Sequence, residues 1–333
     1  MNAPLLTIQK AGLETPWFFA ALFVAASFLM IWRLNAMASR GLEGTVLGTL
    51  IMPYCSGLGN LVFAFLLAKH GGSGTEVMIN SLVNNVTNLT LLIGLPALIL
   101  GMHVLPKNGK KKTKRKNADE KPRLDRLSLL LTLLAVLFFT GATWVLARDG
   151  KLEFTDGLIL VGLFIFWQCF HVFEVLKNNV RQNRSFDGML FVDLAFLALG
   201  AYCVYLSTDW IVSWLSAQKS GFFSAKQIGW VTGWLMVLPN ALLAFYYAWR
   251  NQPEVTYSSQ VGDGHICIPL CIGVFALFKP IAIPAFFETA VLILVGAALV
   301  HYFFVTFFGQ LPRIAGLALT VAYGVFVYKG LLV

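Results

Sequence analysis

The chain has 333 residues, of which 58% are hydrophobic and only 12% are charged, whereas a soluble domain carries roughly 25% charged residues. This composition excludes an ordinary water-soluble globular domain. Apolar stretches of about 20 residues recur from residue 16 to the C-terminus, and each is long enough to cross a hydrocarbon core of about 30 Å as a helix.

The pattern predicts an all-α polytopic membrane protein with about ten transmembrane helices. The expected spans are 16–36, 45–69, 76–104, 127–147, 155–177, 187–215, 226–249, 259–279, 285–308 and 311–332. The N-terminal segment lacks the basic start and small-residue cleavage site of a signal peptide, so we expect the first span to be a retained helix. The expected location is the cell (inner) membrane, as a multi-pass protein.

Basic residues are concentrated in the loop after the third span. Ten of the 25 lysines and arginines lie between Lys107 and Arg126. A solvated basic run beside a membrane helix indicates the cytoplasmic side, and it explains the formal charge of +9 without a nucleic-acid partner. Binding of anionic lipid is a second role open to this loop. If the loop is cytoplasmic, both termini face the opposite side.

The order of the spans divides the chain into two halves. Residues 1–106 hold helices 1–3 with a first repeat at about 45–104, residues 107–126 form the basic loop, residues 127–180 hold helices 4 and 5, and residues 181–333 hold helices 6–10 with a second repeat at about 226–279. Five spans per half is an odd number, so the second half enters the membrane in the opposite orientation. We therefore expect two inverted five-helix repeats.

A repeated motif supports this division. In the first half, Ser56–Phe65 is followed by Asn80–Asn88 and the motif ends at Gly94, and in the second half Val237–Phe245 is followed by Ser259–Cys267 and the motif ends at Gly273. The distance from Asn60 to Gly94 is 34 residues, and that from Asn240 to Gly273 is 33 residues. The two segments are therefore interpreted as equivalent parts of the two halves.

Each half places a helix-loosening residue beside an amide in the middle of a span. Gly57 and Gly59 precede Asn60, and Pro239 precedes Asn240. Glycine and proline free backbone carbonyls, which membranes tolerate only where those groups are buried or line a wet cavity. Secondary transporters bind ions at such broken helices. The alternative is a packing kink whose amide bonds to a neighbouring helix.

The next helix of the first half is unusually polar. Ser81, Asn84, Asn85 and Asn88 are spaced i, i+3, i+4 and i+7, so they share one helix face. Hydrogen bonds between helices would explain one or two such polar side chains. Four on one face favour a polar pathway, and this face is expected to point away from lipid.

In the second half, Ser259, Gln260 and Asp263 share the matching face, and Asp263 is the one acid within the two motif regions, which are residues 56–68 with 80–94 and residues 236–248 with 259–273. An intramembrane acid is by default a functional hypothesis, the alternative being a snorkelling or ion-paired acid near the helix start. The candidate ion-binding residues are Asn60, Asn240, Asn84, Asn85, Asn88, Ser81, Ser259, Gln260 and Asp263.

Other chemistry is not indicated. Glu174, Asp193 and Glu288 lie outside the motif and are expected near an interface or in ion pairs. The five cysteines show no paired extracellular spacing and are expected as small buried thiols rather than disulfides. Nucleotide-binding, zinc-protease and nucleophile-elbow motifs are absent from the sequence. We expect no enzyme and no cofactor, with Na⁺, H⁺ or Ca²⁺ as possible transported ions.

The two repeats resemble the alpha repeats of the calcium/cation antiporter superfamily, which includes the sodium/calcium exchangers. The family pattern looks like Gly-Thr-Ser-x-Pro-Glu on one helix and Gly-Asn-x-x-Gly-Ser-Asn-x-x-Asn on the next. Ser56–Asn60 and Met236–Asn240 occupy the first position, and Asn80–Asn88 and Ser259–Cys267 occupy the second. The segments Asp149–Gly157 and Arg313–Gly316 also resemble the family's entries to the last span of each half, so the resemblance covers nearly the whole chain.

The departures from the family pattern bear on the ion. The resemblance implies that the motif glutamates, central to calcium binding in the family, are replaced here by Asn60 and Asn240. Asn85 matches the asparagine of the family's second helix, whereas Gly264 replaces its partner. Because Ca²⁺ prefers several oxygen ligands including carboxylates, a sodium-type or proton-coupled site survives these changes better.

The resulting expectation is a secondary cation antiporter that works by alternating access, with monovalent or proton-coupled exchange favoured over Ca²⁺. The alternative is a membrane scaffold or sensor on an exchanger fold that has lost transport, which the loss of both motif glutamates supports. A membrane enzyme is the third reading and lacks an acid–base or metal constellation.

Overall fold

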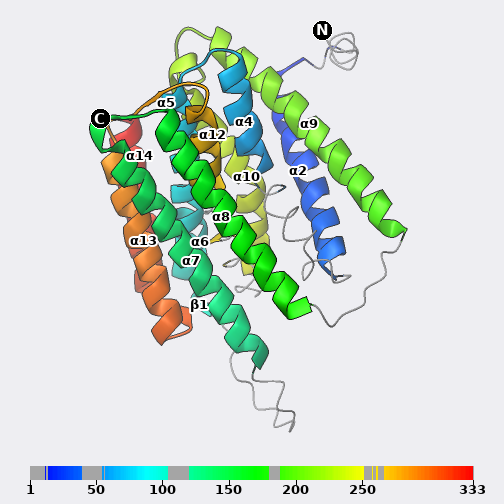
Figure 1. Ribbon diagram of the computed structural model, residues 1–333, viewed down its shortest axis with the longest axis vertical. Helices are drawn as coiled ribbons and strands as arrows, with labels where there is room; N and C mark the ends of the chain where they lie inside the picture. Colours follow the sequence, from blue (N-terminus) through cyan, green and yellow to red (C-terminus); the bar gives the residue numbers. More distant parts are fainter. Residues whose placement is uncertain are drawn as a thin grey trace.

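The computed structural model describes residues 12, 14–39, 55, 57–103, 120–179, 188–250, 257, 260–261 and 266–332. These residues form one bundle of long helices that run roughly along the same direction (Figure 1). The helices of the first half are α2 (Pro16–Ser39), α4 (Leu58–Lys69), α5 (Gly74–Val86), the π-helix η2 (Thr87–Leu91), α6 (Leu92–Leu100), α7 (Glu120–Leu146) and α8 (Phe154–Asn179). Those of the second half are α9 (Met189–Ala217), α10 (Ile228–Trp249), the π-helix η6 (Cys267–Ile272), α12 (Gly273–Ala276), α13 (Phe287–Phe307) and α14 (Arg313–Leu331).

The predicted membrane spans are confirmed. Among the described residues, seven helices are long and apolar enough to cross a membrane, and three shorter apolar helices, Leu58–Lys69, Phe154–Phe170 and Cys267–Ala276, lie where the other three spans were predicted. Large apolar side chains such as Phe166, Leu292 and Ile314 are exposed on the outside of the bundle, as expected where lipid is the solvent. The protein is thus a multi-pass membrane protein with ten crossings.

The start of α7 is one of the boundaries that differ from the prediction. Helix α7 begins at Glu120, inside the predicted basic loop, because a helix can continue into water once its apolar part has left the bilayer. Residues 104–119 of that loop lie outside the described residues. All five cysteines are described as free thiols, but only Cys267 and Cys271 are buried, whereas Cys55 and Cys203 are partly buried and Cys169 is exposed.

The two halves have opposite orientations. In Figure 1, α2 runs from the top of the bundle to the bottom, whereas α9, the first helix of the second half, runs from the bottom to the top. The predicted inversion is therefore confirmed. The central crossing is Gly74–Leu100, of which 78% is buried, against 22% for α14 at the periphery.

Short strands in the linkers join the halves in a symmetric way. Strand β1 (Met102–His103) pairs antiparallel with β4 (Gln310–Leu311), and β2 (Lys151–Leu152) pairs antiparallel with β3 (Ile281–Ala282). The first pair joins the α6–α7 linker to the α13–α14 linker, and the second joins the α7–α8 linker to the α12–α13 linker. Each half therefore donates one strand to the other at each end of the bundle.

Two glycine pairs repeat this exchange inside the bundle. A Cβ atom on Gly316 of α14 would lie 2.7 Å from the carbonyl oxygen of Gly94 in α6, and a Cβ atom on Gly157 of α8 would lie 2.7 Å from that of Gly273 in α12. Small residues allow such close helix contact in membranes. The last helix of each half therefore packs on the motif of the other half, at the glycine that ends it.

The topology leads to a test of the membrane orientation. Helix α7 begins at the bottom of the bundle, and α14 ends at its top beside the C-terminus (Figure 1). Tags inserted at Lys114 and at the C-terminus are therefore expected to report opposite sides of the membrane in a protease-protection or cysteine-labelling experiment. Detection of both tags on one side would contradict the ten-span arrangement.

A buried ion pair connects α2 and α9. Arg33 Nη1 lies 3.5 Å from Asp193 Oδ1, and the side chain of Asp193 is fully buried. The guanidinium also stacks over Trp32, 3.3 Å from the ring centroid. The expected pairing of Asp193 is thereby confirmed, and its partner comes from the first helix of the other half.

Removing one partner of this pair is expected to destabilise the protein. Asp193→Leu leaves the charge of Arg33 without its counter-ion, and a broken buried pair costs about 3–5 kcal/mol. We expect a clear fall in the thermal midpoint in detergent, measured by light scattering. The double variant Arg33→Met/Asp193→Leu removes both charges, so most of the stability should return. Equal midpoints for wild type and Asp193→Leu would show that the pair contributes nothing.

Candidate functional site

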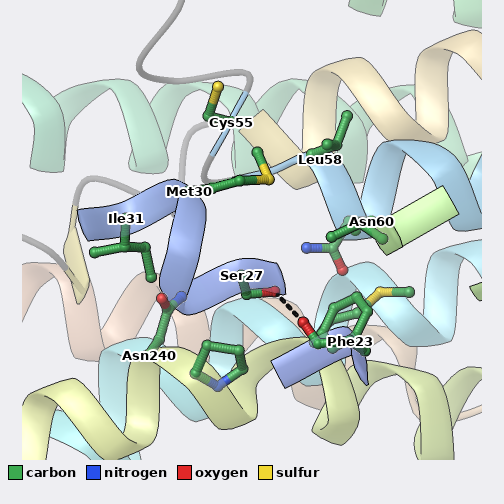
Figure 2. Close-up of a pocket in the computed structure, with 12 residues that line it drawn as sticks. Phe23, Ser27, Met30, Ile31, Cys55, Leu58, Asn60 and Asn240 are labelled. Carbon is green, nitrogen blue, oxygen red and sulfur yellow. Dashed lines mark hydrogen bonds between the residues drawn. The ribbon is translucent and has the colours of Figure 1, made fainter. Parts of the chain in front are cut away.

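Asn60 and Asn240, which stand beside the predicted helix breaks, line one cavity, although α10 runs through Pro239 as one unbroken helix. Asn60 lies in the first turn of α4 and is 4% exposed, and Asn240 follows Pro239 in the middle of α10 and is half-buried. Both line a cavity of about 40 Å³. Figure 2 shows the two amides approaching this space from different helices.

The remaining walls come from helices α2 and α9, outside the motif, and from further motif residues. The cavity is also lined by Phe23, Ser27, Met30 and Ile31 of α2, by Val204 of α9, and by Cys55, Leu58, Gly59, Met236 and Pro239. The Ser27 hydroxyl donates to the Phe23 carbonyl at 2.8 Å (Figure 2). No charged side chain occurs among these lining residues, which belong to the described part of the chain. The space is sufficient for an ion or a few waters, since one water needs roughly 10–15 Å³ of such volume.

Glycine brings the wall helices together at Asn60. A Cβ atom on Gly59 would lie 3.0 Å from Phe23 Cζ of α2 and 3.3 Å from Met236 Cγ of α10. Even a methyl group at this position would require the Phe23 or Met236 side chain to shift by a few tenths of an ångström. The glycines at the start of α4 were predicted to loosen the helix. The structure shows that Gly59 also allows α4 to pack closely against α2 and α10.

The polar stripe of α5 continues from the cavity into the centre of the bundle. Asn84 Nδ2 lies 3.4 Å from Asn60 Oδ1, and Asn88 Nδ2 donates to Asn84 Oδ1 at 3.1 Å. The thiol of Cys267 lies 3.8 Å from the same Asn84 oxygen. Asn60, Asn84, Asn88 and Cys267 are therefore called the amide chain below. It joins α4, α5 and η2 of the first half to η6 of the second.

The other polar residues of α5 are buried as well. Ser81 and Asn85 are fully buried, and Asn80 donates to the Thr232 hydroxyl of α10 at 3.0 Å. Within the described residues, two side-chain oxygen atoms of this face, Ser81 Oγ and Asn88 Oδ1, have no hydrogen-bond partner. Because buried oxygens are normally satisfied, these atoms are available to a cation or a water.

The second-half counterpart is described in part. Gln260 is fully buried, whereas Ser259 and Asp263 lie outside the described residues. Both repeats contain a π-helix at matching places, η2 over Thr87–Leu91 and η6 over Cys267–Ile272. π-Helical turns are rare in proteins, and those that occur are frequently found at functional sites.

Several contributors were missed by the sequence analysis. Ser27 and Val204 line the cavity from α2 and α9, and hydropathy alone does not tell which face of those helices turns inward. Glu76 was also missed: its Oε2 accepts from the Gly229 backbone N–H at 2.7 Å. This carboxylate satisfies a free donor in the first turn of α10, where Gln227 provides no side-chain cap.

Comparison with known proteins gives a consistent result. The family model described as sodium/calcium exchanger protein matches residues 17–173 and 192–329, one segment for each half. A comparison with curated protein sequences gave no match.

Solved structures of the sodium-calcium exchanger NCX_Mj are similar to this chain. The structure soaked with 10 mM Na⁺ and zero Ca²⁺ has a TM-score of 0.63 and 19% sequence identity, over 95% of this chain and 97% of that chain. The structure soaked with 2.5 mM Na⁺ and 10 mM Sr²⁺ has a TM-score of 0.62 and 17% identity, over 92% and 94% of the two chains. At this identity the likeness shows a shared fold.

Proposed function

This chain belongs to the sodium/calcium exchanger family, and from that premise we propose that it exchanges monovalent cations or protons, in preference to Ca²⁺, by alternating access. The family consists of membrane cation antiporters and not of enzymes. The observation that carries the proposal is the convergence of Asn60 and Asn240, one from each half, on a single cavity whose described lining is uncharged.

The charge of the site favours a monovalent ion. Ca²⁺ normally takes six to eight oxygen ligands that include carboxylates, and a divalent ion held by amides alone would leave an uncompensated double charge in a medium of low dielectric constant. A monovalent cation needs one carboxylate. Asp263, the single acid of the two motif regions, is proposed as that counter-charge.

The proposed ligand set combines amides and hydroxyls with this acid. Asn60, Asn84, Asn85, Asn88, Ser81, Asn240, Ser259 and Gln260 are proposed to supply neutral oxygens around Asp263. Support comes from the hydrogen bonds of the amide chain, which link Asn60 to Asn84 and Asn88, and from the partnerless oxygens of Ser81 and Asn88 among the described residues.

The relative's structures suggest the ions for a first test. NCX_Mj was soaked with Na⁺, Ca²⁺ and Sr²⁺. We further propose the cell (inner) membrane as the location, with the basic run Lys107–Arg126 on the cytoplasmic side and in contact with anionic lipid.

The decisive experiment is uptake into proteoliposomes. Purified protein is reconstituted, Na⁺ and H⁺ gradients are imposed in turn, and fluxes of Na⁺, K⁺ and Ca²⁺ are measured in parallel. We expect Na⁺ or K⁺ flux driven by the opposing gradient, with little Ca²⁺ flux. Asn60→Leu/Asn240→Leu, which keeps the side-chain volume and removes both amides, is expected to be inactive, whereas Thr143→Val on α7, distant in sequence from both motifs, should be active.

Two outcomes would contradict the proposal. Ca²⁺ flux larger than Na⁺ or K⁺ flux would show that carboxylates are not needed for a divalent site. The absence of every flux from well-folded protein would favour a scaffold or sensor on an exchanger fold, the reading that Asn60 and Asn240 at the two motif positions support.

A further inference from the structure

The side chain of His301, which lies outside the motif, forms a hydrogen bond with the backbone of η2. His301 of α13 is fully buried, and its Nε2 atom lies 2.7 Å from the Leu89 carbonyl oxygen. A carbonyl oxygen can only accept, so Nε2 carries the proton and donates. The bond joins a helix of the second half to the π-helical turn of the first half.

This turn holds one end of the amide chain. Leu89 is the residue after Asn88, whose amide donates to Asn84, which in turn contacts Asn60 at the cavity. A π-helical turn departs from the i→i−4 bonding of its neighbours, so its backbone needs outside support to keep a single geometry. The direction of the Asn88 amide depends on that geometry, because its Cα belongs to the same turn.

The imidazole is itself held in place. The ring of Tyr257, from the second repeat, packs edge-on against the His301 ring with centroids 5.2 Å apart and planes at 84°. Tyr257 is fully buried. Tyr257 of the second half thus holds the His301 ring that donates to the first-half turn.

We propose that His301 is a positioning residue for the cation site: it clamps the π-helical turn at Leu89 and thereby sets the direction of the Asn88 amide within the amide chain. His301 does not touch the cation. The inference rests on the proposed function for its transport readout, whereas its backbone readout is independent of any ion.

The test compares two substitutions of the same residue. His301→Gln can place an amide N–H near the position of Nε2 and donate to Leu89, whereas His301→Leu cannot donate. Tyr323→Phe is the matched control, since it removes one other interhelical hydrogen bond, from Trp234 Nε1 to the Tyr323 hydroxyl at 2.8 Å, that does not involve η2.

The first readout is hydrogen–deuterium exchange of the peptide that covers residues 87–92, with the full-length protein in nanodiscs. We expect exchange to become about fivefold faster in His301→Leu, the effect of losing one hydrogen bond, and to be near the wild-type rate in His301→Gln and Tyr323→Phe. Unchanged exchange in His301→Leu would overturn the clamp.

The second readout is Na⁺ flux in proteoliposomes. Loss of an outer residue that orients a ligand commonly weakens ion affinity by about 10–100-fold, so we expect a raised Na⁺ concentration at half-maximal flux, a similar maximal rate, and rescue by His301→Gln. Faster exchange with unchanged half-maximal concentration would overturn the link to the site. If wild-type flux does not respond to Na⁺, the monovalent assignment fails, and the exchange comparison alone decides the inference.

Discussion

Introducing two carboxylates at positions 60 and 240 is expected to create a calcium site. In Asn60→Glu/Asn240→Glu both new side chains start from positions that line the same cavity of about 40 Å³, so two negative charges can meet one divalent ion. Either single variant supplies one charge and should bind Ca²⁺ much more weakly. A ligand at 100 times its Kd stabilises the folded state by about 2.7 kcal/mol, which a Ca²⁺-dependent rise in the thermal midpoint would report.

The control for this experiment separates charge from size. Asn60→Gln/Asn240→Gln has the same side-chain length as the glutamate variant and carries no charge, so its thermal midpoint should not respond to Ca²⁺. A folded glutamate double variant without any Ca²⁺-dependent stabilisation would contradict the assignment of these two positions to the cation site.

The second large effect is expected at Asp263. As the single acid of the two motif regions, it is proposed to neutralise the bound monovalent cation, so Asp263→Asn should reduce Na⁺- or H⁺-coupled flux in proteoliposomes to the background of empty liposomes. The variant should fold, since a buried carboxylate without its ion costs free energy that an amide does not.

Glu288→Gln provides the comparison for Asp263→Asn. Glu288 lies in the first turn of α13, outside both motifs, and its neutralisation should leave flux near the wild-type value. If purified Asp263→Asn transports like wild type, the monovalent mechanism is wrong and the scaffold reading gains support.

The helical fold was largely predictable because the membrane leaves few options. Backbone groups in lipid must bond within their own segment, so apolar length alone located the spans, and an odd number per half required the inversion. The four short strands were not predictable. Each contains two residues in a linker, and the pairing of Met102 with Leu311 depends on where distant helices end.

The candidate site was predictable in part. The spacing of Asn60 and Asn240 within matching motifs suggested that they meet, and both line the same cavity. The ion-binding roles of the nine candidates stay predictions. His301 carried no signal in the sequence, since it acts through the carbonyl of Leu89, and a backbone contact between residues 212 positions apart leaves no residue pattern to read.

The exchange of packing partners between the halves has a consequence for biosynthesis. Gly94 of α6 packs against Gly316 of α14, and β1 pairs with β4. Both partners lie in the second half, so the first five crossings cannot complete their contacts when synthesis has reached the end of α8 at Asn179. About 150 further residues must be made first, which takes roughly 8–30 s at 5–20 residues per second. During that interval the polar face of α5 has no second half to cover it. The first half is therefore expected to stay incompletely packed in the membrane until the second half has been made.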